Sequence, residues 1–311
     1  MFSERLPWIG QDPTSQKLLE LAQRAAPVPT TILISGESGT GKNYLARLIH
    51  ELGPRRDTPY LRIDCTMLPS ELAEAELFGY ERGGFPGAGE RKIGAFELGL
   101  KGTIVVDEIA LLSGSSQERL LQVLKVQKLE RLGGKESVAV EARLIALTSA
   151  DMGAAVKAGR FREELYRRLD MMKIWMAPLR ERAGDILPLA EHFLEEIRRG
   201  AGKEQLHLGE TAKASLQAYK WPGNVRELQR VLPRAAANVE TGVMEAVDFP
   251  PEIQSAGKKA AGNNLRSLEE VEREVILATL EATEYQIGRS AEILGISRKT
   301  LLEKRKKFGM K

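Results

Sequence analysis

The chain has 311 residues, 42% of them hydrophobic and 29% charged, which is enough to bury the core of one large domain beside a smaller one. Its apolar runs are far shorter than the roughly 20 residues that cross a bilayer, and its single cysteine cannot form a disulfide within the chain. Since its N-terminus also has no apolar signal segment, we expect a cytoplasmic protein without membrane spans or disulfides. The net charge is only +3, but residues 288–311 hold eight basic and two acidic side chains, which indicates a polyanionic partner at that end.

Residues 9–180 alternate short β-rich runs with helical patterns. The runs are apolar and rich in branched residues, as buried parallel strands are: 30–38, 60–65, 102–109 and 142–150. Strands that alternate with helices predict an α/β fold, in which helices cover both faces of a parallel sheet.

The remaining pattern is helical. Residues 181–249 are predicted to form a helical subdomain, and residues 250–266, rich in Pro, Gly, Ala, Lys and Asn without apolar periodicity, a linker. Residues 267–311 are predicted to form a small all-α domain, whose first helix carries an apolar stripe suited to dimer formation or to a core.

The sequence GESGTGK lies between an apolar strand and a helical pattern, which is the context of a phosphate-binding P-loop. Its glycines allow backbone amides to converge on phosphates at the positive end of the next helix, and Lys42 can reach the β- and γ-phosphates of a nucleotide. Asn43 replaces the usual hydroxyl, so a direct Mg²⁺ ligand is missing there. The predicted nucleotide-binding residues are Gly36, Glu37, Ser38, Gly39, Thr40, Gly41, Lys42 and Asn43.

Residues 83–88, GGFPGA, lie in a glycine-rich stretch with Phe85 at its centre. Glycine permits sharp bends of the backbone. We therefore expect a mobile loop with one apolar tip, formed by Gly83, Gly84, Phe85, Pro86, Gly87 and Ala88.

The strand TIVVDE ends in two acids. Asp107 can hold Mg²⁺ through water, and Glu108 can polarise the water that attacks the γ-phosphate. Acids that end a strand are common, but beside a P-loop they indicate nucleotide hydrolysis.

Arginines in two later segments are candidates for contact with phosphate. Arg162 and Arg168, in GRFREELYRRLD, could enter the nucleotide site of a neighbouring subunit, with a solvated basic face as the alternative. Arg226 lies in the first turn of the helix that begins in WPGNVREL, where arginine is electrostatically disfavoured unless an anion compensates it.

Near the C-terminus, Ala291, Gly295 and Leu301 have the spacing of a helix-turn-helix. We expect Ser297 to cap the second helix, whose first turn would reach base edges while its later basic residues meet phosphates. The predicted DNA-binding residues are Ser297, Arg298, Lys299, Thr300, Lys304 and Arg305; the alternative is a solubilising basic tail.

Together, GESGTGK, ELFGYERGGFPGA, GTIVVDEI, GRFREELYRRLD, PLRERAGDI and WPGNVREL resemble the central AAA+ ATPase domain of bacterial sigma-54-dependent transcription activators. The C-terminal segment resembles their Fis-type DNA-binding domain. The resemblance implies a P-loop sheet with a helical lid, ATP and Mg²⁺ as cofactors, and DNA and sigma-54 RNA polymerase as partners. It also implies a hexamer that hydrolyses ATP to remodel a closed promoter complex.

The same resemblance assigns roles to single residues. Lys42 corresponds to the Walker A lysine, and Asp107 and Glu108 correspond to the Walker B pair. Arg162 and Arg168 correspond to arginine fingers that act on a neighbouring subunit, Thr148 and Ser149 to sensor I, and Arg226 to sensor II. Residues 83–88 correspond to the GAFTGA loop that touches sigma-54.

Departures from the family pattern leave other functions open. Asp64 stands where the family has asparagine and would repel Glu108 or share a proton with it. In sensor I, Ser149 and Ala150 replace the usual Asn-Arg. In the GAFTGA loop, Gly84 replaces alanine and Pro86 replaces threonine. A member that has lost contact with sigma-54, and acts as a DNA-bound regulator or repressor, is the nearest alternative, and a replication or recombination motor is another. Only eight residues precede Ile9, so we expect no receiver domain.

Overall fold

The structure, a computed structural model, describes residues 6–84, 89–239, 242–262, 268–283 and 285–308. The chain divides into two compact units, Met1–Gly257 and Lys258–Lys311. Each unit has a hydrophobic core of its own, and each is described by itself below.

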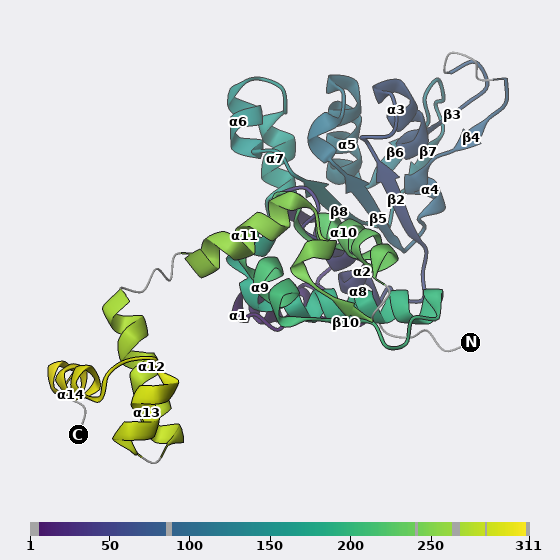
Figure 1. Cartoon of the computed structure of the whole chain (residues 1–311). Helices are drawn as coiled ribbons and strands as arrows, with labels where there is room; N and C mark the ends of the chain where they lie inside the picture. Colours follow the sequence, from purple (N-terminus) through teal and green to yellow (C-terminus); the bar gives the residue numbers. More distant parts are fainter. Residues whose placement is uncertain (1–5, 85–88, 240–241, 263–267, 284, 309–311) are drawn as a thin grey trace. The chain divides into compact units, whose positions relative to one another are not determined.

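The first unit is built on a five-stranded parallel sheet with the order β2-β5-β8-β1-β9 (Figure 1). The strands are β1 (Ile32–Ser35), β2 (Tyr60–Asp64), β5 (Thr103–Asp107), β8 (Arg143–Thr148) and β9 (Lys173–Trp175). Because all five run the same way, their carboxyl ends meet at one edge of the sheet, where ligands bind in open α/β folds. The predicted parallel sheet is confirmed, except that β2 is a half-buried edge strand rather than a buried one.

Alternating side chains of the central strands supply the cores on the two faces. Ile104 and Val106 pack on one side and Val105 on the other. The first side is covered by α3 (Ser70–Phe78), α4 (Ala95–Leu98), α5 (Gly114–Val126), α6 (Met152–Lys157) and α7 (Glu163–Leu169), and the second by α1 (Pro13–Ala25) and α2 (Lys42–Leu52). Both faces are therefore dry, as near-continuous apolar strands require.

Two small antiparallel hairpins interrupt the predicted alternation. One pairs β3 (Gly79–Tyr80) with β4 (Lys92–Ile93), and the other pairs β6 (Lys128–Glu130) with β7 (Ser137–Ala139). The predicted loop 83–88 joins β3 to β4; Gly83 and Gly84 are described, whereas Phe85, Pro86, Gly87 and Ala88 lie outside the described residues. Helix α5, which leads into the second hairpin, ends at Val126, because Gln127 takes a left-handed conformation.

The helical lid follows the sheet. It consists of α8 (Ile186–Ala201), α9 (Glu210–Ala218) and α10 (Asn224–Asn238), with β10 (His207–Leu208) paired to β11 (Val243–Met244). Trp221 is fully buried at the centre of the lid core, and its indole nitrogen donates to the carbonyl of Leu216 at 2.8 Å. The hydrogen bond satisfies the one polar atom of this large side chain.

The segment predicted as a linker, 250–266, is helical over α11 (Pro251–Gly262). Proline suits the first turn of a helix, whose amides have no partners within the helix, and Ile253 is buried in the lid core. Because Ile253 is a single buried apolar residue, the segment has no helical repeat of apolar residues, and the sequence pattern did not predict this helix.

The second unit contains α12 (Leu268–Ala282), α13 (Ile287–Ile293) and α14 (Arg298–Lys307). Its core joins Ile276 and Leu280 to Ala291 and Leu301. Gly295 makes the turn with φ +64°, and Ser297 caps α14 by accepting a hydrogen bond from the amide of Thr300 at 3.0 Å. The expected helix-turn-helix is therefore present. Within the described residues no helix has the length and apolarity to cross a membrane.

Candidate functional site

The P-loop lies between the end of β1 and the start of α2. Gly39 and Gly41 have φ values of +79° and +105°, a conformation that glycine adopts without strain. Lys42 is 6% exposed, and its Nζ donates to the carbonyls of Gly36 at 2.8 Å and Glu37 at 3.1 Å. Burial lowers the pKa of Lys42, which the neighbouring Glu108 carboxylate partly opposes. The lysine is thus held at the mouth of the loop, where an incoming phosphate can replace its carbonyl partners.

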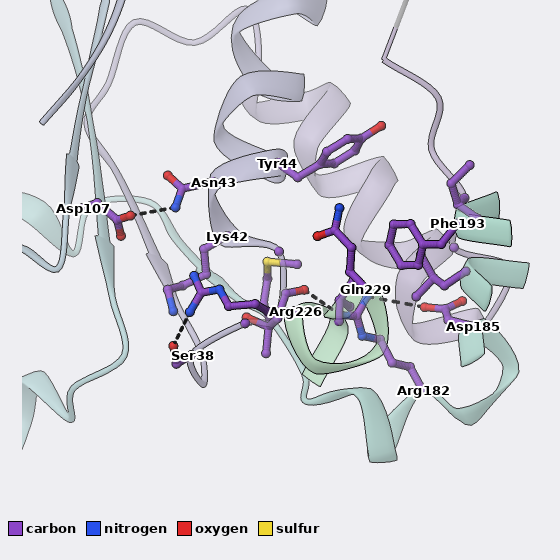
Figure 2. A pocket seen from close by; sticks show the side chains of 18 of the residues that line it. Ser38, Lys42, Asn43, Tyr44, Asp107, Arg182, Asp185, Phe193, Arg226 and Gln229 are labelled. Carbon is purple, nitrogen blue, oxygen red and sulfur yellow. Dashed lines mark hydrogen bonds and ion pairs between the residues drawn. The ribbon is translucent and has the colours of Figure 1, made fainter. Parts of the chain in front are cut away.

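A cavity of about 470 Å³ opens beside the loop (Figure 2), within the range of about 300–1,000 Å³ typical of small-molecule sites. One part is polar, with Lys42, Asp107 and Arg226. Another part is apolar and comes from the N-terminal segment and the lid: Trp8, Ile9, Leu189, Phe193 and Val225. The sequence analysis missed this apolar part, because its residues lie in three segments with no motif of their own.

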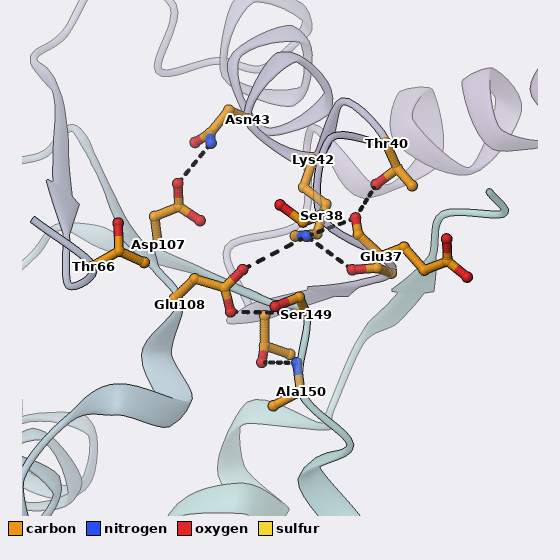
Figure 3. Close-up of polar contacts among 12 residues, drawn as sticks. Glu37, Ser38, Thr40, Lys42, Asn43, Thr66, Asp107, Glu108, Ser149 and Ala150 are labelled. Atoms are coloured by element: carbon orange, nitrogen blue, oxygen red, sulfur yellow. Dashed lines mark hydrogen bonds and ion pairs between the residues drawn. The ribbon is translucent and has the colours of Figure 1, made fainter. Parts of the chain in front are cut away.

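The two acids that end β5 have different partners (Figure 3). Asp107 Oδ2 accepts a hydrogen bond from Asn43 Nδ2 at 2.7 Å. Glu108 Oε2 accepts from the amide of Ser149 at 2.8 Å, and its Oε1 lies 3.8 Å from Lys42 Nζ. Glu108 itself is left-handed, with φ 51° and ψ 54°, an uncommon conformation for a non-glycine residue and one of the strained conformations that cluster at functional sites.

The expected sensor residues lie beside this pair. Ser149 contacts Glu108 through its backbone amide rather than its side chain, so the contact does not depend on the asparagine usual in the family. The Thr148 hydroxyl accepts a hydrogen bond from the amide of Ala150 at 3.0 Å and so fixes the turn after β8.

Among the described residues no hydrogen bond joins Asp64 to Glu108, so the expected alternative in which the two acids share a proton is not seen. Asp64 Oδ1 accepts from the amide of Thr66 at 3.0 Å and from its hydroxyl at 2.6 Å, and Asp64 Oδ2 accepts from Arg62 at 2.6 Å. Aspartate readily bonds the backbone two residues on, and Arg62 lies two residues before it on the same face of β2. Local partners therefore hold the carboxylate.

The lid grips the P-loop through a set of polar contacts. Arg180 forms a bidentate pair with Glu37 at 2.8 and 2.5 Å, and Asn224 Nδ2 donates to the carbonyl of Ser38 at 3.0 Å. Arg182 donates to the carbonyl of Thr40 at 2.7 Å. Hydrogen bonds from Arg180 and Asn224 lower the pKa of Glu37 to about 2, so this carboxylate stays charged at any ordinary pH.

Arg226 lies in the first turn of α10, where the sequence predicts a need for a compensating partner. Its guanidinium donates to the Ser38 hydroxyl at 3.0 Å, and its backbone amide donates to the carbonyl of Gly39 at 3.2 Å. It therefore stands over the P-loop within the cavity wall, where a phosphate would compensate its charge.

Arg168 lies in α7, and Arg162 is the N-cap residue that precedes it. Arg162 pairs with Glu118 at 2.9 Å, and its amide donates to Gln117. Neither arginine is among the described residues that line the cavity of its own chain.

The base of the 83–88 loop is joined to the second hairpin. The carbonyl of Leu132 accepts from the amide of Glu81 at 3.0 Å, and a Cβ on Gly84 would lie 2.1 Å from the same oxygen. Only glycine fits at position 84 in this arrangement. Nearby, the buried Arg131 binds Glu81, Glu97 and Glu136 at 2.7 to 2.9 Å.

On the helix-turn-helix, Arg298 and Lys299 are exposed at the start of α14 and Thr300 is half-buried. Lys304 instead pairs with Glu272 of α12 at 2.6 Å, and Arg305 is half-buried. Arg298 and Lys299 in the first turn of α14 are thus more exposed to a ligand than Lys304 and Arg305.

Comparison with known protein families assigns three regions of the chain. Residues 8–175 match the Sigma-54 interaction domain, residues 180–278 the AAA+ ATPase lid domain, and residues 267–308 the Fis family of bacterial regulatory proteins. The chain belongs to the sigma-54-dependent activator family. Its fold class, a P-loop sheet with an AAA+ lid and a Fis-type helix-turn-helix, is that of the family.

Relatives match nearly the whole chain. It is 38% identical to nitrogen fixation protein AnfA of Azotobacter vinelandii, with 97% of this chain and 57% of that protein covered. It is 37% identical to the sigma54-dependent transcriptional activator SfnR of Pseudomonas putida, with 93% and 85% covered. The crystal structure of NtrX from Brucella abortus in complex with ATP superposes with a TM-score of 0.75 at 31% identity, over 98% of this chain and 70% of that one.

Gly39 should be a sensitive position of this site. Gly39→Ala puts a Cβ 2.3 Å from the carbonyl of Gly223 at a φ of +79°, so we expect it to destabilise the first unit by about 1–3 kcal/mol and to weaken ATP binding at least tenfold. Chemical denaturation and equilibrium ATP binding measure both effects.

The matched control is Gly114→Ala, where a Cβ meets nothing within 4 Å among the described residues. It should leave both quantities unchanged. Equal behaviour of the two variants would contradict the close approach of loop and lid.

Proposed function

We propose that this protein is a DNA-bound ATPase that forms a ring and uses ATP hydrolysis to remodel sigma-54 RNA polymerase, in the cytoplasm, and so activates transcription. The observation that carries the proposal is that the P-loop, which is hydrogen-bonded to the lid and to the segment before it, lines the same cavity as Asp107 and Glu108. In an activator of this family, that arrangement has a nucleotide as its natural ligand.

The residues around the cavity divide the work on ATP. Lys42, Arg226 and the loop amides would hold the phosphates, and the apolar part with Trp8 and Phe193 would take the purine. Glu108 would polarise the attacking water, with the Ser149 amide and Lys42 fixing its carboxylate.

The donor set fits Mg²⁺. This ion prefers one or two carboxylates together with phosphates and water, and Asp107 offers a carboxylate beside Asn43, whose buried Oδ1 has no hydrogen-bond partner among the described residues. Position 43 would therefore offer an amide oxygen to the metal or its water in place of the missing hydroxyl. When bound, Mg²⁺ would neutralise phosphate charge.

A second subunit would complete the site. Arg162 and Arg168 do not line their own cavity, and arginines supplied by a neighbour can stabilise the charge that develops on the γ-phosphate. This supports the hexamer proposed from the family, in which α7 of one subunit would face the nucleotide of the next.

The loop 83–88 would contact sigma-54. Its base is bonded to the second hairpin through Glu81 and Leu132, so a displacement of either hairpin would move the loop. The alternative, a member that has lost sigma-54 contact, depends on Pro86, which lies outside the described residues.

Two variants should distinguish the residues needed for ATP binding from those needed only for hydrolysis. Lys42→Ala should abolish ATP binding, and Glu108→Gln should retain it while hydrolysis falls by about 10²–10⁴. Lys101→Ala, at a side chain 74% exposed and paired to Glu141, is the charge-matched control. Unchanged ATP affinity in Lys42→Ala would refute the P-loop assignment.

Open-complex formation at a sigma-54 promoter tests the coupling. We expect the unmodified protein to be active with ATP, and the Lys42→Ala variant to be inactive. Inactivity of the unmodified protein together with gain of activity in Pro86→Thr would favour the alternative, because proline offers neither an N–H nor a hydroxyl.

DNA recognition should depend on the start of α14. Replacement of Arg298 and Lys299 by alanine should reduce specific promoter binding by about 10- to 100-fold, since each bidentate base contact contributes roughly 1–3 kcal/mol. Lys213→Ala in the lid is the control, and electrophoretic mobility shifts against specific and random DNA are the measurement. Retained sequence preference in the double variant would contradict this placement of the reading helix.

A further inference from the structure

Two carboxylates end neighbouring strands side by side. Asp64 and Asp107 are direct partners in the parallel register of β2 and β5. Like charges directly opposite each other on adjacent strands repel, and the Asp107 side chain is only 9% exposed, so water screens it poorly. This pair needs a compensating positive charge.

Arg62 provides that charge. One nitrogen, Nη2, lies 2.6 Å from Asp64 Oδ2 and 2.7 Å from Asp107 Oδ2. The side chain is 42% exposed, so it lies at the open mouth of the cavity and can shift into water without unpacking the core.

The same oxygen of Asp107 also accepts from Asn43 Nδ2 at 2.7 Å. Two donors therefore converge on Asp107 Oδ2. The other amide atom of Asn43, the buried Oδ1, has no donor within the described parts of the chain. A buried acceptor without a donor is costly, and a bound cation or its water would satisfy it.

We propose that Arg62 is a positioning residue that competes with Mg²⁺ for Asp107. Without nucleotide, the guanidinium neutralises Asp107. When the metal enters with ATP, its charge repels Arg62, which remains paired with Asp64 alone, while Asn43 Oδ1 turns to the metal or its water. Asp64 is then the anion that retains the displaced arginine. The inference rests on the proposed function, because it requires Asp107 to hold the metal.

Binding of Mn²⁺, a paramagnetic probe for the Mg²⁺ position, to the full chain with a non-hydrolysable ATP analogue tests this without turnover. Electron paramagnetic resonance measures the Mn²⁺ dissociation constant. Arg62→Gln should lower it by about fivefold to tenfold, since one neighbouring positive charge is removed. Arg62→Lys, which keeps the charge, should stay near the unmodified protein.

A double-mutant cycle tests the role of Asp64. Asp64→Asn should raise the Mn²⁺ dissociation constant when Arg62 is present, because the arginine then pairs with Asp107 alone, and should have a smaller effect in the Arg62→Gln background. Arg56→Gln, in the exposed Arg56–Asp57 pair before β2, is the control and should change nothing.

Unchanged or weaker Mn²⁺ binding in Arg62→Gln would overturn the proposal. The proposal would also be overturned if Arg62→Gln bound the analogue more weakly than the unmodified protein when EDTA removes the metal. Arg62 would then contact phosphate directly. If the unmodified protein bound the analogue but no Mn²⁺, the metal part of the proposed function would fail instead, and the two failures are thus distinguishable.

Discussion

The grip of the lid on the P-loop is the interaction on which the rest of the structure depends. The loop has no regular structure of its own, and several of its carbonyls point to partners outside it. Arg180 holds Glu37, Asn224 holds the Ser38 carbonyl, and Arg182 holds the Thr40 carbonyl. Since these partners come from the lid and from the segment that leads into it, the loop cannot change shape without a response in the lid.

A second constraint is the balance of charge at the carboxyl edge of the sheet. Asp64, Asp107 and Glu108 crowd this edge, and each has its own compensation: Arg62 and Thr66 for the first, Arg62 and Asn43 for the second, Lys42 and the Ser149 amide for the third. Glu108 and Asp64 therefore have separate hydrogen-bond partners. A nucleotide with its metal would rearrange these pairs, which gives the site a way to sense what it has bound.

Sequence reasoning was strongest where a residue's role follows from local chemistry. The P-loop glycines, the acids after an apolar strand and the Ser297 cap depend on neighbours within a few residues, and all lie where the pattern predicted. It failed where a partner comes from far along the chain. Nothing local to Trp8 or Phe193 indicated a shared cavity wall. Asp64 is a different case, because its partners Arg62 and Thr66 are each only two residues away, whereas the expectation followed the family pattern and considered Glu108 alone. The helix over Pro251–Gly262 escaped prediction because a single buried side chain, Ile253, anchors it.

The most direct measurement of the central claim is a crystal structure of the full chain with a non-hydrolysable ATP analogue. The account predicts a triphosphate seated on the amides of residues 36–41, with Lys42 and Arg226 on opposite sides of it and the purine beside Trp8 and Phe193. A cavity that remains closed by the lid, or an analogue bound away from these residues, would contradict it.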